Sequence, residues 1–230
     1  MSISPKKTAT KPAIGNDVVD LKDTDSLDIL QNHPFLQRVF TENELEFIHN
    51  ANNPRAKAWG LWAAKESAYK TARQLNAKTI FSPKLYEVDP IKCIVIRDKK
   101  SFIFTKTETT DYVHTESILQ EENNMNNSNK NKKRTWIQSL QELIDNEEIN
   151  IIADNIKAYN EQSGYCRAFA TWLLRNELGL PDGYIHKESL GPRCPPELYN
   201  NQQKITDSAI SLSHHGRFCA VAICGNLIKS

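Results

Sequence analysis

The sequence predicts an α+β protein with two lobes, on the strength of three features. Residues 55–73 contain no proline and consist mostly of good helix formers, which favours one long helix. Residues 84–118 are rich in β-branched and aromatic residues, which favours strands. Residues 121–134 are rich in Asn, Lys and Glu and nearly lack apolar side chains, so we interpret them as a flexible connection.

Composition narrows the range of functions. The 230-residue chain has a formal net charge of +1, which gives no overall attraction to nucleic acid or to an anionic membrane. No apolar run approaches the roughly 20 residues that cross a bilayer. Residues 1–12, interpreted as a disordered tail, lack the apolar stretch of a signal peptide. Five cysteines without a Cys-x-x-Cys pair indicate reduced thiols, and hence a cytoplasmic protein, rather than a disulfide frame or a zinc site.

The first lobe, residues 13–120, begins with an apolar segment at residues 13–21, which predicts a strand. Asp17 lies inside this segment, and a carboxylate there is costly unless it is paired or binds a cation. A turn or helix-capping aspartate is the alternative reading of this residue.

Helices are expected after this strand. A polar connection over residues 23–40 ends in a short helical patch at residues 35–40. Thr41 and Glu44 then match a capping box, which predicts a helix to about residue 49. Pro54 separates this helix from the long one.

Four residues of the long helix share one face: Trp59, Trp62, Glu66 and Lys70 are spaced by three or four positions. A core face would exclude Glu66, and a solvent face would not need two indoles. Considered alone, the pattern is most simply a partly buried helix with a surface ion pair between Glu66 and Lys70.

The remaining elements are predicted from shorter patterns. Strands are expected at residues 86–88, 93–96, 102–105 and 112–118, with a hairpin turn at residues 98–100. After a linker at residues 121–135, the second lobe, residues 136–230, is expected to contain helices at 136–146, 149–159 and 163–178, with Gly179 just past the last one, and an irregular segment at 183–196.

The chain closes with a predicted hairpin, whose strands lie at residues 210–213 and 218–223. Its turn contains His214, His215, Gly216 and Arg217. A solvated hairpin end is the alternative to a functional site, and two adjacent histidines are poorly spaced for a structural zinc.

Three motifs together resemble one family, the 4'-phosphopantetheinyl transferases. Residues 14–20, Ile-Gly-Asn-Asp-Val-Val-Asp, are similar to its Gly-x-Asp strand, and residues 62–70 to its Trp-x-x-Lys-Glu-Ser-x-x-Lys helix. Residues 211–214, Ser-Leu-Ser-His, are similar to its Ser-x-Ser-His hairpin. The helix and hairpin motifs in one chain are specific, and the three motifs with their intervening elements cover most of it.

The order of the motifs implies an unusual arrangement. In the two-lobed, surfactin-synthetase-activating type of this family, the histidine hairpin precedes the Gly-x-Asp strand, whereas here it closes the chain. Residues 13–118 resemble the second lobe of that type and residues 163–223 the first, so the lobes look swapped. The resemblance implies two similar lobes in a pseudo-twofold arrangement with the site between them.

The activity implied by the resemblance is transfer of the phosphopantetheine arm of coenzyme A to a serine of an apo acyl or peptidyl carrier protein, with Mg²⁺ as cofactor and 3',5'-ADP as leaving group. A monomer is expected, without nucleic-acid or membrane partners. Asp17 and Glu66 are implied as metal ligands, and Glu66, Lys70 and His214 as catalytic residues. The coenzyme A contacts implied are Lys70, Arg167, Arg193, Ser213 and His214.

Two positions depart from the family pattern. The acidic residue often found two after the aspartate is Val19 here, and the acid follows at Asp20, which would point to the other face of a regular strand. Arg193 stands one residue away from the lysine of the family's Gly-Lys-Pro segment. A non-catalytic binder of coenzyme A or of a carrier protein is the alternative function, and an unrelated phosphate-binding scaffold is a third.

Overall fold

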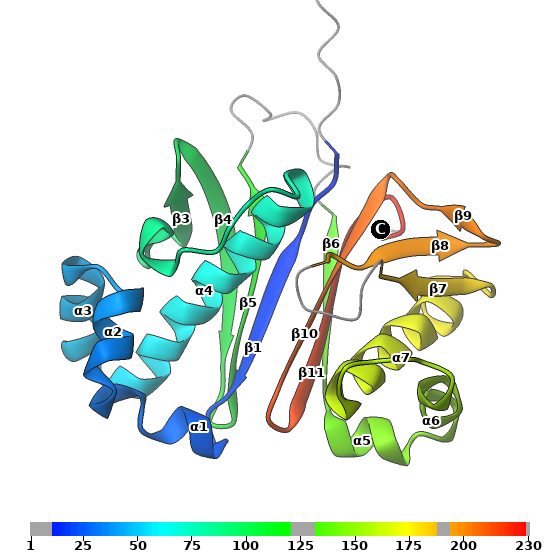
Figure 1. Ribbon diagram of the computed structural model, residues 1–230, viewed down its shortest axis with the longest axis horizontal. Helices are drawn as coiled ribbons and strands as arrows, with labels where there is room; N and C mark the ends of the chain where they lie inside the picture. The colour runs from blue at the N-terminus through cyan, green and yellow to red at the C-terminus, as the bar shows by residue number, and fades with distance from the viewer. Residues whose placement is uncertain (1–10, 121–131, 188–193, 229–230) are drawn as a thin grey trace, which may run out of the picture.

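The computed structural model describes residues 11–120, 132–187 and 194–228 and shows the predicted α+β class. Two units lie side by side, each a long helix packed on an antiparallel sheet (Figure 1). The exact lobe boundaries and the pseudo-twofold relation stay predictions. In the described part of the chain, no helix combines the length and the apolar character needed to cross a membrane.

The first unit contains a five-stranded antiparallel sheet in the order β1-β5-β4-β3-β2. Asp98 and Lys99 have φ values of 47° and 64°, as a tight hairpin turn between β3 and β4 requires. All the strands predicted for this lobe are confirmed, with ends shifted by a few residues. They are β1 (Gly15–Asp20), β2 (Glu87–Asp89), β3 (Ile94–Arg97), β4 (Lys100–Glu108) and β5 (Tyr112–Leu119).

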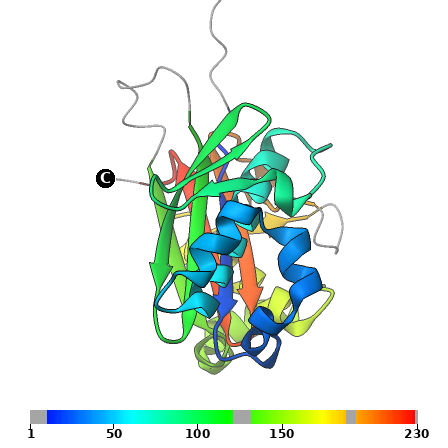
Figure 2. The same cartoon turned by 90° about the vertical axis from the view of Figure 1, so that its left-hand side faces the viewer.

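The long helix of this unit is α4 (Pro54–Leu75), which packs on β1 and β5. It begins at Pro54 itself, although the helix was predicted to begin after this residue, because proline fits the first turn of a helix. Figure 2 turns this side of the molecule to the viewer, with the blue helices in front of the sheet. These are α1 (Thr24–Leu27), α2 (His33–Val39) and α3 (Glu42–His49), and the short 3-10 helices η1 (Ile29–Gln31) and η2 (Pro83–Leu85) complete the unit.

Side-chain caps at the helix N-termini explain α3 and the shorter helices before it. The predicted capping box is complete: Thr41 Oγ1 accepts from Glu44 N at 3.4 Å, and Glu44 Oε2 accepts from Thr41 N at 2.8 Å. The helical patch expected at residues 35–40 is confirmed as α2, which begins at His33, whereas the connection expected before it contains α1 and η1. Side-chain caps explain the difference, because Asp23 caps α1 and Asn32 caps α2.

A buried ion pair joins α3 to α4. Lys65 Nζ lies 2.7 and 2.8 Å from the two carboxylate oxygens of Glu44 and donates to the carbonyl oxygen of Tyr86 at 2.6 Å. Lys65 is fully buried and Glu44 is 3% exposed, and burial lowers the pKa of the Lys65 ammonium although Glu44 opposes the shift. The first lysine of the Lys-Glu helix therefore makes a structural contact between α3 and α4.

The second unit contains a three-stranded sheet in the order β10-β11-β6, on which α7 (Glu161–Asn176) packs. The predicted hairpin is confirmed as β10 (Ser208–His215) and β11 (Phe218–Gly225), with Gly216 at φ 52° in its turn, but His214 and His215, predicted in the turn, lie in β10. The other elements of the unit are β6 (Lys133–Ser139), α5 (Leu140–Asp145), α6 (Glu147–Asp154) and a small sheet of β7 (Gly183–His186), β8 (Glu197–Asn200) and β9 (Gln203–Lys204).

Four expectations for this half are corrected. The helix predicted from residue 136 begins only at Leu140, because residues 133–139 pair with β11 as a strand. This strand also shortens the predicted linker, of which residues 121–131 lie outside the described residues, as do residues 1–10 of the predicted tail. The helix expected at 149–159 ends at Asp154, the irregular segment expected at 183–196 contains β7, and β8 and β9 follow it where no strand was predicted.

Side chains of β10 cover the free edge of β1. The Oγ atoms of Ser211 and Ser213 accept from the backbone N–H of Asn16 and Val18 at 2.9 and 3.0 Å. The next residue on the same strand face, His215, accepts through Nδ1 from Asp20 N at 3.2 Å. Alternate side chains of β10 therefore accept hydrogen bonds from the backbone N–H groups at the free edge of β1. These bonds fix the register of β10 against β1.

Small side chains allow this close approach. Ile14 packs between the sheets against Ala209, Ala222 and Cys224. The end of β11 therefore lies beside the start of β1, as the swapped-lobe hypothesis requires, although Ile223 itself points into the core of the second unit. On its other side β1 passes so near α4 that a Cβ on Gly15 would lie 1.8 Å from the carbonyl oxygen of Ser67, which explains the glycine of the motif.

Candidate active site

A cavity of about 230 Å³ lies where β1 and α4 of the first unit meet α7 and β10 of the second. It brings together five of the residues predicted for the site. Among the described residues, the lining is Asp17, Tyr69, Lys70, Arg73, Gln74, Tyr159, Ser163, Cys166, Arg167, Lys187, Cys194, Pro195, Pro196, Ser211, Leu212, Ser213 and His214.

Asp17 is held from both units. Its Oδ1 accepts from Lys70 Nζ at 2.8 Å and from Ser213 Oγ at 3.0 Å. Lys70 also donates to the carbonyl oxygen of Asn16 at 2.8 Å. Burial alone would lower the pKa of the Lys70 ammonium, but the charges of Asp17 and Glu66 raise it above its ordinary value. Lys70 is therefore a firmly charged cation at the cavity.

Glu66 lies one helical turn before Lys70. Burial, and then the charge of Asp17, raise the pKa of its carboxyl to about 7, although Lys70 opposes the shift. Among the described residues Glu66 is not part of the cavity lining, and Lys70 bonds Asp17 rather than Glu66. This helix therefore does not form the surface ion pair between Glu66 and Lys70 that the sequence alone suggested. A carboxyl with a pKa of about 7 can exchange protons near neutral pH.

His214 contacts protein groups through both ring nitrogens. Its Nε2 lies 3.2 Å from the hydroxyl of Tyr159, and its Nδ1 lies 3.2 Å from Oε1 of Gln162. Burial, and then the charge of Lys70, lower the pKa of the ring to about 4, so His214 is neutral at pH 7. His215 lies on the opposite face of β10, against Asp20, and does not line the cavity.

Arg167 brings a buried cation to the cavity. It is 7% exposed, and its Nη1 donates to the carbonyl oxygen of Lys157 at 3.0 Å. Its Nε and Nη2 have no partner among the described residues. Burial lowers the pKa of this guanidinium, which still stays protonated at neutral pH. Donors in this position are suited to an anion that enters the cavity.

Two further basic residues of the lining, Arg73 and Lys187, were not predicted from the sequence. Arg73 could have been found, because it lies three residues after Lys70 on the same helix. No motif marks Lys187, which follows β7; burial, and then Arg167, lower the pKa of its ammonium. Arg193 lies outside the described residues.

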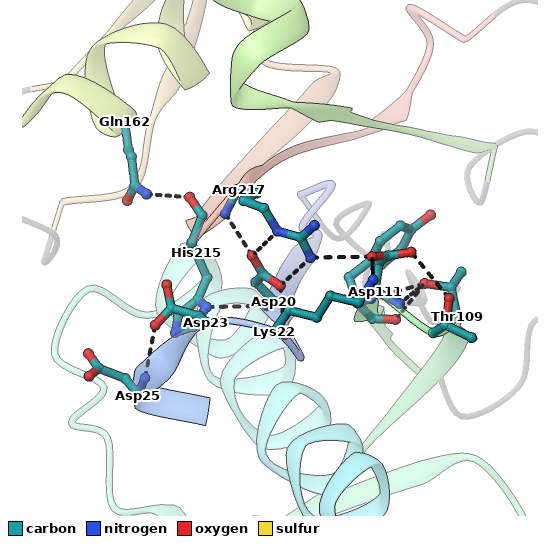
Figure 3. Close-up of polar contacts among 12 residues, drawn as sticks. Asp20, Lys22, Asp23, Asp25, Thr109, Asp111, Gln162, His215 and Arg217 are labelled. Atoms are coloured by element: carbon teal, nitrogen blue, oxygen red, sulfur yellow. Dashed lines mark hydrogen bonds and ion pairs between the residues drawn. The ribbon is translucent and has the colours of Figure 1, made fainter. Parts of the chain in front are cut away.

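Asp20 serves the junction of the units rather than the cavity (Figure 3). Its carboxylate, 1% exposed, accepts from Arg217 Nε and Nη2 at 2.8 Å each and from the backbone N–H of Arg217 and Lys22 at 2.9 Å each. Burial would raise the pKa of Asp20, but these hydrogen bonds lower it to about 2. The arginine of the hairpin turn therefore binds the acid that ends β1.

The carboxylate oxygens near the cavity suit a divalent cation that takes only some of its ligands from the protein. Within the described residues, no three His, Cys, Asp or Glu side chains form a metal-ligand cluster. Asp17 and Glu66 are nonetheless close enough for the charge of one to raise the pKa of the other. Two carboxylates suit Mg²⁺, which commonly takes its other ligands from water and substrate phosphates.

Comparisons with known proteins agree with the motifs. Residues 13–124 match the family model of the 4'-phosphopantetheinyl transferase superfamily, which confirms the resemblance; the hairpin motif lies outside the matched segment. A stretch of 41 residues is 42% identical to the fatty acid synthase subunit alpha of Candida parapsilosis, and it covers 18% of this chain and 2% of that protein.

Two solved structures of holo-acyl-carrier-protein synthases are also similar. The one from Bacillus anthracis, in complex with CoA (3',5'-ADP), is 21% identical, with 50% of this chain and 100% of that chain covered and a TM-score of 0.40. The one from Thermotoga maritima is 12% identical, with 65% and 77% covered and a TM-score of 0.34.

Proposed function

Residues 13–124 belong to the 4'-phosphopantetheinyl transferase superfamily, and from this premise we propose that the protein transfers the 4'-phosphopantetheine arm of coenzyme A to a serine of an apo carrier protein. The serine oxygen forms a bond to the β-phosphorus of coenzyme A. The bond from that phosphorus to the bridging oxygen breaks, and 3',5'-ADP leaves with the bond's electrons.

One observation carries the proposal: Asp17, Lys70, Arg167 and His214 converge on a single cavity between the units. Lys70 and the two nitrogens of Arg167 that lack a partner among the described residues supply positive charge to a site that must hold a diphosphate. Lys187 and Arg73 add to this charge. Apart from Asp17, the described lining contains no other carboxylate, so the cavity favours a polyanion.

Proton transfer falls to the residues of α4. Glu66, one helical turn before Lys70, would accept the serine proton directly or through one water. Lys70 would stabilise the charge that develops on the departing phosphate oxygen. Ser213 has both functions of its hydroxyl engaged, since it accepts from Val18 N and donates to Asp17. In this arrangement Ser213 holds Asp17, and it could donate to a phosphate oxygen only by giving up its bond to Asp17.

Mg²⁺ would be held by Asp17 and Glu66, and when bound it would neutralise phosphate charge. Both sides of the cavity come from one chain, which supports action as a monomer. The Candida relative is named as a fatty acid synthase subunit, so a fatty-acid carrier protein is the first acceptor to test. Polyketide and peptide carriers follow in the panel.

Intact mass measurement tests this function. The protein is incubated with coenzyme A, Mg²⁺ and a panel of apo carrier proteins, and we expect at least one carrier to gain the mass of the arm. A control carrier with alanine in place of the acceptor serine should gain nothing. If no carrier gains mass while coenzyme A still binds, the protein is a non-catalytic binder of the same fold.

A further inference from the structure

Gln162, in the first turn of α7, connects His214 to the turn of the hairpin. Its Nε2 donates to the carbonyl oxygen of Gly216 at 2.6 Å, and its Oε1 lies 3.2 Å from Nδ1 of His214. The start of α7 is itself anchored, because Asn160 caps it by accepting from Ser163 N at 2.8 Å. Gln162 is half-buried, so these two bonds define the orientation of its amide.

The amide orientation decides where the proton of His214 lies. A carbonyl oxygen can only accept, so the group of Gln162 that faces Gly216 must be its NH₂. The oxygen of the amide then faces Nδ1 of His214, and this contact is a hydrogen bond only if Nδ1 carries the proton. On the other side of the ring, the hydroxyl of Tyr159 can donate or accept, so it adapts to either tautomer.

We propose that Gln162 is a positioning residue that holds neutral His214 in its Nδ1–H tautomer, so that Nε2 presents an acceptor to the cavity. Tyr159, a residue that is 49% exposed, occupies that acceptor with its hydroxyl in the structure. A ligand group with an O–H donor, such as a ribose or carrier hydroxyl or a singly protonated phosphate, takes the place of Tyr159. That the ligand is coenzyme A rests on the proposed function.

This arrangement sets a condition on the role of His214. Donation to a fully ionised phosphate oxygen requires a second proton on Nε2, because Nδ1–H is already committed to Gln162. Without Gln162 the ring would be free to exchange between its two tautomers and to rotate. Gln162 therefore acts through His214 and need not touch the ligand.

Nitrogen NMR tests the tautomer directly. In ¹⁵N-labelled full-length protein, the shifts of the two ring nitrogens report which one is protonated, and His214→Ala identifies the signals. We expect Nδ1–H in the wild type and in Gln162→Glu, whose carboxylate also accepts from Nδ1. Gln162→Leu should shift the ring toward Nε2–H, whereas Gln141→Leu, on an exposed face of α5, should leave it unchanged.

Wild-type His214 in the Nε2–H form, or a tautomer that Gln162→Leu leaves unchanged, would contradict the role of Gln162. Calorimetry with 3',5'-ADP gives a second readout: we expect Gln162→Leu to weaken binding about three- to tenfold, as for loss of one oriented hydrogen bond, and Gln162→Glu to retain more of it. If neither the wild type nor any variant binds 3',5'-ADP, the proposed function fails, while the spectra still decide the tautomer.

Discussion

Replacing Asp20 with asparagine removes a charge from the junction of the two units and keeps the shape of the side chain. The wild-type carboxylate receives four hydrogen bonds from Arg217 and Lys22, and its pKa falls from 3.8 to about 2. At 1.36 kcal/mol per pKa unit, this shift corresponds to about 2 kcal/mol. We therefore expect Asp20→Asn to lower the free energy of unfolding by about 2 kcal/mol at pH 7.

The destabilisation caused by Asp20→Asn should become smaller as the pH falls. Because folding depresses the pKa of Asp20, the stabilisation is fully present above the unfolded pKa of 3.8 and is lost as the pH falls through about 2. The difference between wild type and Asp20→Asn should therefore be constant from pH 7 to pH 5 and fall to about half by pH 3.

Urea unfolding at pH 7, 5 and 3, followed by tryptophan fluorescence, measures this difference. Asp111→Asn is the matched control, because Asp111 contacts the same arginine but its side chain is 37% exposed. We expect a smaller effect there, since solvent screens the pair. A difference for Asp20→Asn that is absent, or that does not change with pH, would refute the assignment of the junction's stability to this ion pair.

Three further predictions follow from the structure. His214→Ala should weaken coenzyme A binding measured by calorimetry, whereas His215→Ala should mainly lower the melting temperature, because His215 contacts β1 and not the cavity; a larger binding defect for His215→Ala would reverse the assignment. Lys65→Met should lower the free energy of unfolding in urea by about 3–5 kcal/mol, because it leaves Glu44 buried without its partner, and Lys65→Met with Glu44→Gln should recover part of this loss; equal single and double variants would contradict the pair. A circularly permuted chain, opened between residues 123 and 131 and closed by a Gly/Ser link from the end of β11 to residue 13, should fold and bind coenzyme A, because Ile14 packs against Cys224; a permuted protein that folds but does not bind would count against the swapped lobes.

Sequence reasoning worked where short-range chemistry decides the structure. The capping box at Thr41, the proline at the start of α4 and the turn at Gly216 each depend on residues a few positions apart. It failed for β6, because the residues after Thr135 become a strand only by pairing with β11, which lies far along the chain. The small sheet of β7, β8 and β9 was missed for the same reason.

In the candidate site too, residues that lie in local motifs were predicted, and residues that long-range packing brings to the site were missed. Asp17, Lys70 and His214 lie in motifs, and the structure brings them to one cavity. Lys187 reaches the same cavity only through the path of the chain after β7, which no local pattern specifies. Gln162 resembles any polar residue in a first helical turn, and its contact with His214 depends on the packing of α7 against β10.

The most direct test of the account compares wild type with Glu66→Gln in phosphopantetheine transfer. Both proteins are incubated with coenzyme A, Mg²⁺ and the acceptor carrier protein, and the gain in carrier mass is followed with time, with 3',5'-ADP binding and the melting temperature measured in parallel. Loss of the general base should slow transfer by roughly 10²–10⁴-fold or more while the fold is retained. A Glu66→Gln variant that transfers within a few-fold of the wild-type rate would contradict the assignment of this carboxylate to the chemistry.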